Sequence, residues 1–389
     1  MKVCGIIAEY DPFHLGHQYQ METARRLSGA DYVVCVLSTA FLQRGVPALF
    51  PTRERVRMAL LGGADAVFSL PAAFSPMEAE RFALGGVFIL NQLSVVSHLS
   101  FGCECGDLSL LSRAADMLEE PSPLFQRCLR QGLNSGASFA CAQGRALSQA
   151  AGFDPADLSM PNNTLAICYL RMIRRLSGHL LPVPVKRLGA HDENEPSAGL
   201  YPCASYIREK TVSGAWEAVA AAVPPSSLTI MRACASNGEL CPENALDQAL
   251  LYRLRQMDEA QLDRLPNMSE GLENRFIRAL SRAATREELI GLIKTRRYPY
   301  ARISRVLTHA LLGMEKESLP ALPAYTRLLG FRKTALPLLH QIGKESSISV
   351  YSKNADHKAE LMQDANAEAI RSLGAGKPSS FFTESPVII

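Results

Sequence analysis

Residues 3–17 read VCGIIAEYDPFHLGH, and this stretch decides the fold. An apolar, β-prone run ends in a turn that contains proline, and a helix-compatible segment follows at once. A turn of this kind presents free backbone N–H groups and the positive end of a helix dipole, which is where phosphate groups bind. We therefore predict a nucleotide site directly after this strand.

Two histidines in the stretch form a His-x-Gly-His element. His14 and His17 are three residues apart, so they share one face of the first helical turn if the helix begins near Leu15. Gly16 has no Cβ that would keep a phosphate or a purine away. The alternative is a structural turn in which one histidine caps the helix and the other faces water.

A second element of the phosphate-binding type lies at residues 204–208, ASYIR. Ser205 is expected to cap a short helix and to offer N–H groups to the outer phosphates of ATP. Arg208 is expected to neutralise charge on the departing pyrophosphate. Nucleotidyltransferases of the His-x-Gly-His kind use such a pair, so the two elements together indicate attack on the α-phosphate of ATP.

Short β-prone runs alternate with amphipathic segments over the first two hundred residues. This alternation predicts an α/β fold with a doubly wound parallel sheet of the HxGH nucleotidyltransferase type, with its ligand at the carboxyl ends of the strands. The predicted strands are residues 3–8, 32–37, 66–70 and 98–101, and the predicted helices are residues 16–27, 51–61, 76–93 and 108–118.

The pattern becomes mostly helical after Gly214, and 389 residues are enough for two domains. We predict a nucleotidyltransferase-like, ATP-binding catalytic domain over residues 1–212 and a mostly helical second domain over residues 213–389. The initial apolar run is too short for a signal peptide and no segment reaches the length of a membrane span, which predicts a cytoplasmic protein.

Three other classes of site find little support in the sequence. Cys103-Glu104-Cys105 has no matching second pair, so no metal site is predicted. Residues 374–377, GAGK, resemble the end of a P-loop, but Arg371 and Pro378 stand where that loop needs glycine and serine or threonine. No G-x-G-x-x-G follows a strand, and no G-x-S-x-G elbow occurs. No protein partner is indicated.

Blocks of sequence along most of the chain match one family in order. They are residues 5–19, 41–45, 101–104, 161–163, 186–187, 191–192, 204–208, 270–275, 295–298, 302–305 and 325–331. Together they resemble the bacterial tRNA(Met) cytidine acetate ligases, nucleotidyltransferase-like proteins that make N4-acetylcytidine at the wobble position of elongator methionine tRNA. The chain departs from the family at Asp11, where asparagine is usual, at Thr39-Ala40, where Gly-Asn is expected, and at Thr52-Arg53, which replaces Lys-Trp.

The resemblance implies an ATP site built from the opening segment, a glycine after a later strand, an asparagine and an arginine. The expected ATP-binding residues, with Ser205 added from the second element, are Ile7, Ala8, Glu9, Tyr10, Asp11, Pro12, Phe13, His14, Leu15, Gly16, His17, Gln18, Tyr19, Gln20, Gly102, Asn162, Arg187 and Ser205. The expected catalytic residues are His14, His17 and Arg208. ATP, with Mg²⁺, would activate acetate as acetyl-adenylate before transfer of the acetyl group to cytidine N4.

Basic residues gather in several places along the chain. One cluster is Arg171, Arg174 and Arg175. A longer track precedes and follows the start of the helix predicted over residues 299–312, on which His309 extends the basic stripe, and its candidate tRNA-binding residues are Arg296, Arg297, Arg302 and Arg305. This track is the electrostatic footprint of a phosphate-backbone partner. The alternative is a helix docked on a core with a solvated edge.

Two other functions remain open from the sequence. One is a small-molecule adenylyltransferase, or an acyl-adenylate ligase of the pantothenate-synthetase type, on the same fold. The other is an RNA-binding protein whose catalytic site has decayed. A large helical domain with basic tracks favours the tRNA enzyme over the first, and the retained His14, His17 and Arg208 argue against the second.

Overall fold

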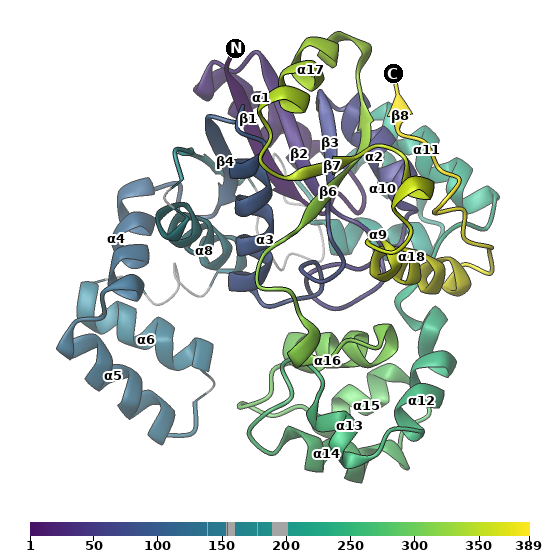
Figure 1. Ribbon diagram of the computed structural model, residues 1–389. Coiled ribbons are helices and arrows are strands. Elements are labelled where there is room, and N and C mark those ends of the chain that lie inside the picture. The colour runs from purple at the N-terminus through teal and green to yellow at the C-terminus, as the bar shows by residue number, and fades with distance from the viewer. Residues whose placement is uncertain (138, 153, 155–159, 177, 189–200) are drawn as a thin grey trace.

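The computed structural model describes residues 1–137, 139–152, 154, 160–176, 178–188 and 201–389. One block of the resemblance, residues 191–192, lies outside them. Figure 1 shows a sheet with helices on both faces and a group of helices below it. The described residues form eight strands in one sheet, in the order β5-β4-β1-β2-β3-β6-β7, with β8 paired to β6.

Five neighbouring strands are parallel, as the alternation predicts. They are β1 (Val3–Ala8), β2 (Tyr32–Ser38), β3 (Ala66–Leu70), β4 (His98–Cys103) and β5 (Leu181–Lys186). The chain runs from β1 to β2 and β3 on one side, then crosses to place β4 on the other side of β1. This reversal makes a crevice at the carboxyl ends of β1 and β4, where ligands of doubly wound sheets bind.

The sheet is completed by strands from the end of the chain, which the sequence did not predict. They are β6 (Tyr325–Phe331), β7 (Ser349–Tyr351) and β8 (Val387–Ile388), and β6 runs antiparallel to β3. The segment from residue 325 onward therefore contributes strands to the same sheet as residues 1–212. A domain boundary near residue 212 remains a prediction.

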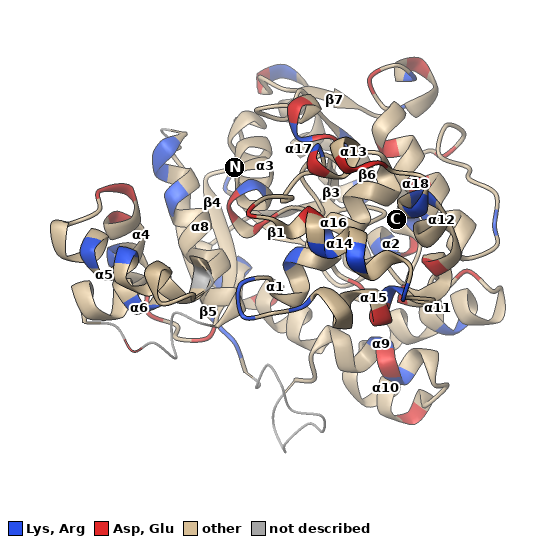
Figure 2. Cartoon of the chain, turned by 90° about the horizontal axis from the view of Figure 1, so that it is seen from below, with Lys and Arg blue, Asp and Glu red and all other residues tan. Residues whose placement is uncertain are grey.

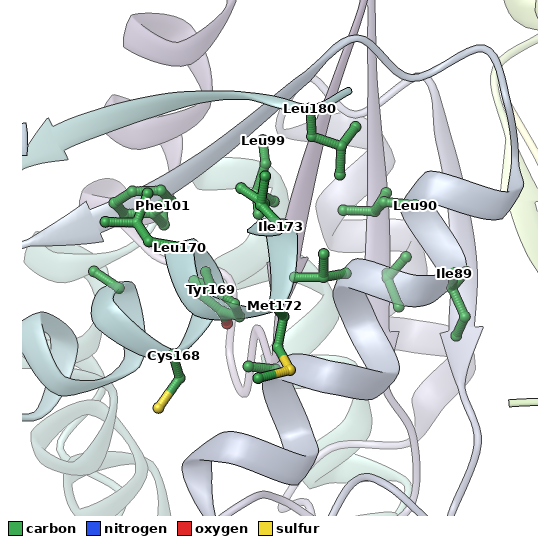
Figure 3. Packing of buried hydrophobic residues seen from close by; sticks show 14 of the residues in the cluster. Ile89, Leu90, Leu99, Phe101, Cys168, Tyr169, Leu170, Met172, Ile173 and Leu180 are labelled. Atoms are coloured by element: carbon green, nitrogen blue, oxygen red, sulfur yellow. The ribbon is translucent and has the colours of Figure 1, made fainter. Parts of the chain in front are cut away.

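Alternate side chains of the strands enter two separate cores, one on each face of the sheet. Val34 and Val36 point to the first core, and Cys35 and Leu37 point to the second. The first core is closed by α3 (Ala79–Gln92), α4 (Leu108–Glu119), α8 (Pro161–Arg175) and α17 (Leu336–Glu345). Figure 3 shows Leu99 and Phe101 of β4 against Tyr169 and Leu170 of α8.

The second core lies under helices from the first and the middle parts of the chain. These are α1 (Leu15–Ser28), α2 (Thr52–Leu61), α9 (Ala204–Val212), α10 (Trp216–Ala222) and α11 (Pro225–Ser236). A hairpin of α5 (Pro123–Asn134) and α6 (Phe139–Ala151) extends the first core beyond the sheet. The last long helix, α18 (Met362–Gly374), follows β7.

The helices below the sheet have a core of their own. This bundle consists of α12 (Asp247–Arg255), α13 (Glu259–Asp263), α14 (Leu272–Leu280), α15 (Arg286–Ile293) and α16 (Tyr300–Leu312). Short 3-10 turns occur at Glu243–Leu246, Lys316–Ser318, Lys333–Ala335 and Asn354–His357. The helix predicted over residues 299–312 is α16, and its apolar stripe is buried in this core, as expected.

Candidate active site

A cavity of about 240 Å³ opens at the carboxyl ends of β1 and β4. Its walls come from the turn after β1, the first turns of α1 and α8, the end of β5 and the start of α9. Of the residues expected to bind ATP, those that line it are Ile7, Ala8, Glu9, Tyr10, Asp11, His14, Gly16, His17, Tyr19, Gln20, Gly102, Asn162 and Arg187. Arg208 also lines it.

The turn after β1 is shaped so that α1 begins at the His-x-Gly-His element. Tyr10 has a φ of 47°, and the Asp11–Pro12 peptide is cis. His14 is the N-cap of α1, and its Nδ1 accepts a hydrogen bond from the Gly16 N–H at 3.0 Å. A Cβ on Gly16 would lie 2.9 Å from the His14 ring, so glycine is required here by the histidine itself.

The two histidine rings lie on one face of α1, as the spacing predicts. They stack with their centroids 3.6 Å apart and their planes inclined by 26°. Because Nδ1 of His14 accepts from the backbone, its proton is on Nε2, which is the nitrogen left to donate to a ligand. His14 thus caps the helix, which is one half of the alternative given above. It is nevertheless buried, and it lines the cavity together with His17.

Both histidines are held in the neutral form. Burial, followed by the nearby charges of Arg187 and Arg208, lowers the pKa of His14 to about 3. Burial is also the main reason that the pKa of His17 lies well below its usual value, with His14 and Arg187 acting in the same direction and a Pro12 backbone hydrogen bond opposing them. The pair can therefore donate hydrogen bonds to phosphate without carrying charge.

We expect neither ring to bind a proton between about pH 5 and pH 8, the range in which an ordinary histidine titrates. The unfolded chain binds these protons below about pH 6.5, whereas the folded protein does not. The free energy of unfolding is therefore unaffected by the two histidines above that pH and falls as the pH drops toward their folded pKa. NMR of labelled histidine rings, assigned with His14→Gln and His17→Gln, measures the protonation of each ring as the pH is changed. A signal from either ring that titrates near pH 6.5 would show that the pair is not buried and neutral.

The carboxylate at position 11 faces away from the cavity. Its two oxygens accept hydrogen bonds from the Leu49 N–H at 2.9 Å and the Phe50 N–H at 3.0 Å. The Arg55 guanidinium lies 4.0 Å from it, and both side chains are almost fully buried. Asp11 therefore does not repel phosphate, and only its backbone carbonyl turns toward the site, where it accepts from Arg208 at 2.9 Å.

Cations dominate the polar lining of the cavity. Lys186 and Arg187 end β5, Arg208 lies on α9, and Arg44 comes from the loop between β2 and α2. Glu9 is a carboxylate in the lining, and its Oε1 accepts from the Gln43 N–H at 2.6 Å. The arrangement suits a polyphosphate, because several fixed positive groups surround neutral donors.

Asn162 is fixed by the loop after β4. The Glu104 carboxylate accepts from the Asn162 side chain at 2.6 Å and from the Asn163 N–H at 2.8 Å, so it caps the start of α8. In return, Asn163 Oδ1 accepts from the Glu104 N–H at 2.9 Å. Gly102 lies on the same side, and a Cβ there would be 3.6 Å from Arg187.

Several residues named from the sequence lie elsewhere. Those that do not line the cavity are Pro12, Phe13, Leu15, Gln18 and Ser205. Phe13 is fully buried, and its ring packs on Gly62. The expectation that Ser205 caps a helix is wrong, because Cys203 is the N-cap of α9 and Ser205 is exposed beside it.

Thr39 and Ala40 are also outside the cavity lining. Both are buried, and the Thr39 carbonyl accepts from Arg55. The departure from the family at these positions therefore lies behind the site and not in its wall.

Other residues line the cavity without having been named as site residues. They are Gln43, Arg44, Phe82, Phe101, Pro161, Leu165, Tyr169, Val185, Lys186, Leu188, Tyr201 and Ala204. Gln43 and Arg44 belong to the block at residues 41–45, which was the available sequence signal for them. Phe101 lies in the block at residues 101–104 and carries the same kind of signal. Phe82 and Tyr169 carry none, because they come from helix stripes that are typical of a core.

The basic clusters differ in how far they are available to a partner. Arg171 and Arg175 of α8 both pair with Glu80 and Glu119, and Arg174 pairs with Asp116 at 3.0 Å. Figure 2 shows this intermixing of charge over much of the chain. That cluster therefore joins α8 to α3 and α4.

The track around α16 is more open. Arg296 and Arg297 are exposed, while Arg302 pairs with Glu270 at 2.8 Å and also donates to Ser269. Among the described residues, the buried Nε of Arg305 finds no hydrogen-bond partner.

His309 does not belong to the basic stripe, contrary to expectation. It is fully buried between the carbonyls of Pro266 and Pro76, and burial lowers its pKa to about 4. It joins the bundle to the segment between β3 and α3.

The described part of the chain contains neither a cluster of metal ligands nor a membrane-spanning helix. Within it, no three histidine, cysteine, aspartate or glutamate side chains come close enough together to hold a metal ion. Also within it, no helix has both the length and the apolar character required to cross a bilayer.

Comparison with known proteins places the chain among nucleotide-dependent enzymes. Residues 1–382 match the family described as HIGH Nucleotidyl Transferase. A protein of Acetivibrio thermocellus named tRNA(Met) cytidine acetate ligase is 36% identical over 370 residues, covering 92% of this chain and 89% of that protein. One of the same name from Clostridium perfringens is 32% identical, with 100% of both chains covered.

The fold is similar to that of a solved structure over its whole length. That structure is Thermotoga maritima TmcAL bound with alpha-thio ATP. The two chains are 26% identical and superpose with a TM-score of 0.91, and the match covers 100% of each.

Proposed function

Because this chain belongs to the tRNA(Met) cytidine acetate ligase family of HIGH nucleotidyl transferases, we propose that it uses ATP to join acetate to N4 of the wobble cytidine of elongator methionine tRNA. The observation that carries the proposal is the cavity at the switch point of the sheet. There, two neutral, stacked histidines lie among the cations of Arg187 and Arg208.

The first step is attack of an acetate oxygen on the α-phosphorus of ATP. It forms acetyl-adenylate and breaks the bond to pyrophosphate, so negative charge grows on the α-phosphoryl oxygens and on the leaving group. We assign the Nε2–H of His14, with His17 beside it, to the phosphoryl oxygens, and Arg187 and Arg208 to the pyrophosphate. Donors fixed before the reaction stabilise that charge without reorganisation.

The second step is attack of the cytidine N4 amine on the acyl carbon, which releases AMP and a proton from N4. The amine is a weak nucleophile because its lone pair is delocalised into the ring. Close positioning and exclusion of water from the adenylate are therefore required. We propose that the apolar side of the cavity, which includes Phe82, Phe101 and Tyr169, supplies this exclusion.

ATP and tRNA also require a counter-ion and a basic surface. We propose that Mg²⁺ enters with ATP and is held by its phosphates. The tRNA would meet the exposed Arg296 and Arg297, together with Arg305. Arg302 and Arg297 share Glu270 as a partner, at 2.8 Å and 3.6 Å. A tRNA substrate is consistent with a cytoplasmic enzyme.

The test uses labelled acetate, ATP and unmodified elongator methionine tRNA. We expect label on cytidine as N4-acetylcytidine, with release of AMP and pyrophosphate, and no product when acetyl-coenzyme A replaces acetate and ATP. The measurement is nucleoside analysis of the tRNA after digestion, with elongator tRNA for another amino acid as the control. Adenylylation of a phosphorylated small molecule, with the tRNA untouched, would instead show a small-molecule adenylyltransferase.

A further inference from the structure

A second hollow, of about 610 Å³, lies between the α5–α6 hairpin and the bundle. It shares no lining residue with the ATP cavity. Figure 1 shows the hairpin and the bundle extending to the same side of the sheet. This interlobe cleft is lined by Leu133, Gly136, Ala137, Phe139, Asn267, Ser269, Glu270, Arg297, Arg302 and Arg305.

The hairpin wall of the cleft presents an aromatic ring that the hairpin does not use in its own core. Phe139, the first residue of α6, is 59% exposed. The hairpin is instead anchored by Phe125, Cys128 and Leu147, which are buried in the core next to the sheet. Leu133, which is 40% exposed, lines the same cleft, and exposed apolar side chains that gather in one hollow mark interaction sites.

The charged residues of the hairpin are all basic. Residues 121–152 contain Arg127, Arg130 and Arg145 and no aspartate or glutamate. All three arginines are exposed. Figure 2 shows the same bias as blue without red on α5 and α6. The hairpin therefore favours an anionic partner.

The bundle wall adds three guanidinium groups and one carboxylate. Glu270 pairs with Arg302 at 2.8 Å and with Arg297 at 3.6 Å. Arg305 keeps a buried Nε for which the described residues offer no hydrogen-bond acceptor. Arg305 also lines the cleft, and within the described part of the chain it forms no salt bridge, so its guanidinium is left for an anion such as phosphate.

We propose that the interlobe cleft holds a single-stranded RNA loop, with one base stacked on Phe139 and the sugar-phosphate backbone against Arg305 and Arg297. A basic groove with an aromatic platform is the usual means of binding unpaired nucleic acid. The inference rests on the proposed function, because the loop is then the anticodon loop of the tRNA, whose splayed bases can stack. An acidic peptide could meet the arginines but would gain little from the ring.

The hairpin is well placed to present such a loop to the ATP cavity. It packs on α4 through α6, and α4 packs on α8. The first turn of α8 lines the ATP cavity with Pro161 and Asn162. The hairpin is therefore joined, through α4, to the helix that borders the reaction site.

The experiment compares tRNA binding by Phe139→Ala, Phe139→Trp and the full-length wild-type protein. Loss of one stacked base is expected to weaken binding of methionine tRNA about tenfold in the alanine variant, and tryptophan should restore it. Tyr252→Ala is the matched control, because Tyr252 is 67% exposed on α12 and lies outside the cleft. Acetate-dependent exchange of pyrophosphate into ATP, without tRNA, should be equal in all four proteins.

Three outcomes separate this inference from the proposed function. Wild-type affinity in Phe139→Ala, together with normal exchange, would overturn the cleft assignment and leave the ligase standing. Weak binding by both Phe139 variants would show that packing and not stacking matters, and would also overturn it. Absence of exchange and of tRNA binding in the wild-type protein would overturn the proposed function itself.

Discussion

Replacement of His14 by alanine is expected to lower the rate of acetyl-adenylate formation by about 100-fold or more. The variant loses the Nε2–H donor, and the Gly16 N–H that His14 caps is left without its acceptor. His17→Ala should have an effect of similar size, because its ring holds His14 in place by stacking. The measurement is acetate-dependent exchange of labelled pyrophosphate into ATP at saturating substrate.

The effect should be specific to these two histidines. His340→Ala is the matched control, since His340 is exposed on α17, and it should exchange at the wild-type rate. The double variant His14→Ala, His17→Ala should be no slower than about the slower single variant, because the residues act as one unit. Exchange at the wild-type rate in the double variant would remove the histidines from the mechanism.

Much of the nucleotide-binding half could be predicted because its signals are local. The strand over residues 3–8 and the helix after it follow from an apolar run, a turn and a spacing of three, and the stacked histidines follow from that spacing. Gly102, Asn162 and Arg187 required the resemblance, since they are far apart in the sequence and only the fold brings them to one cavity.

What could not be predicted depends on contacts between distant segments. The strand over residues 325–331 pairs antiparallel with β3, which lies far earlier in the sequence, so nothing local indicates that pairing. The burial of His309 depends on the carbonyls of Pro76 and Pro266, which no pattern on its own helix reveals. The orientation of the Asp11 carboxylate likewise depends on backbone amides at residues 49–50.

Asp11 and Arg55 form a buried connection behind the cavity. The Arg55 side chain is fully buried and donates to the carbonyls of Glu9 at 2.7 Å, Ser38 at 2.9 Å and Phe50 at 3.2 Å. It therefore joins the ends of β1 and β2 to the loop that carries Gln43 and Arg44. Arg371 of α18 holds the same loop through the carbonyls of residues 48 and 49.

Replacement of Arg55 by methionine is expected to lower the free energy of unfolding by about 3–5 kcal/mol, because it leaves the Asp11 carboxylate buried without its cation and several carbonyls without a donor. Arg57→Met is the control on the same helix. Arg57 is 56% exposed and its contact with Glu54 is 3.6 Å long, so its loss should cost at most about 1 kcal/mol. Chemical denaturation measures both.

A second substitution tests the assignment of that energy to the buried charge. Asp11→Asn removes the charge but leaves one carbonyl oxygen to accept from the loop amides. In the Arg55→Met background it should therefore cost less than it does alone, and the difference between the two costs is the coupling between the side chains. Equal costs in both backgrounds would mean that Arg55 stabilises the loop through its carbonyl contacts alone. The loop that the buried pair holds also carries Gln43 and Arg44, which line the cavity. A variant that displaces this loop should therefore lose acetate-dependent exchange as well as stability.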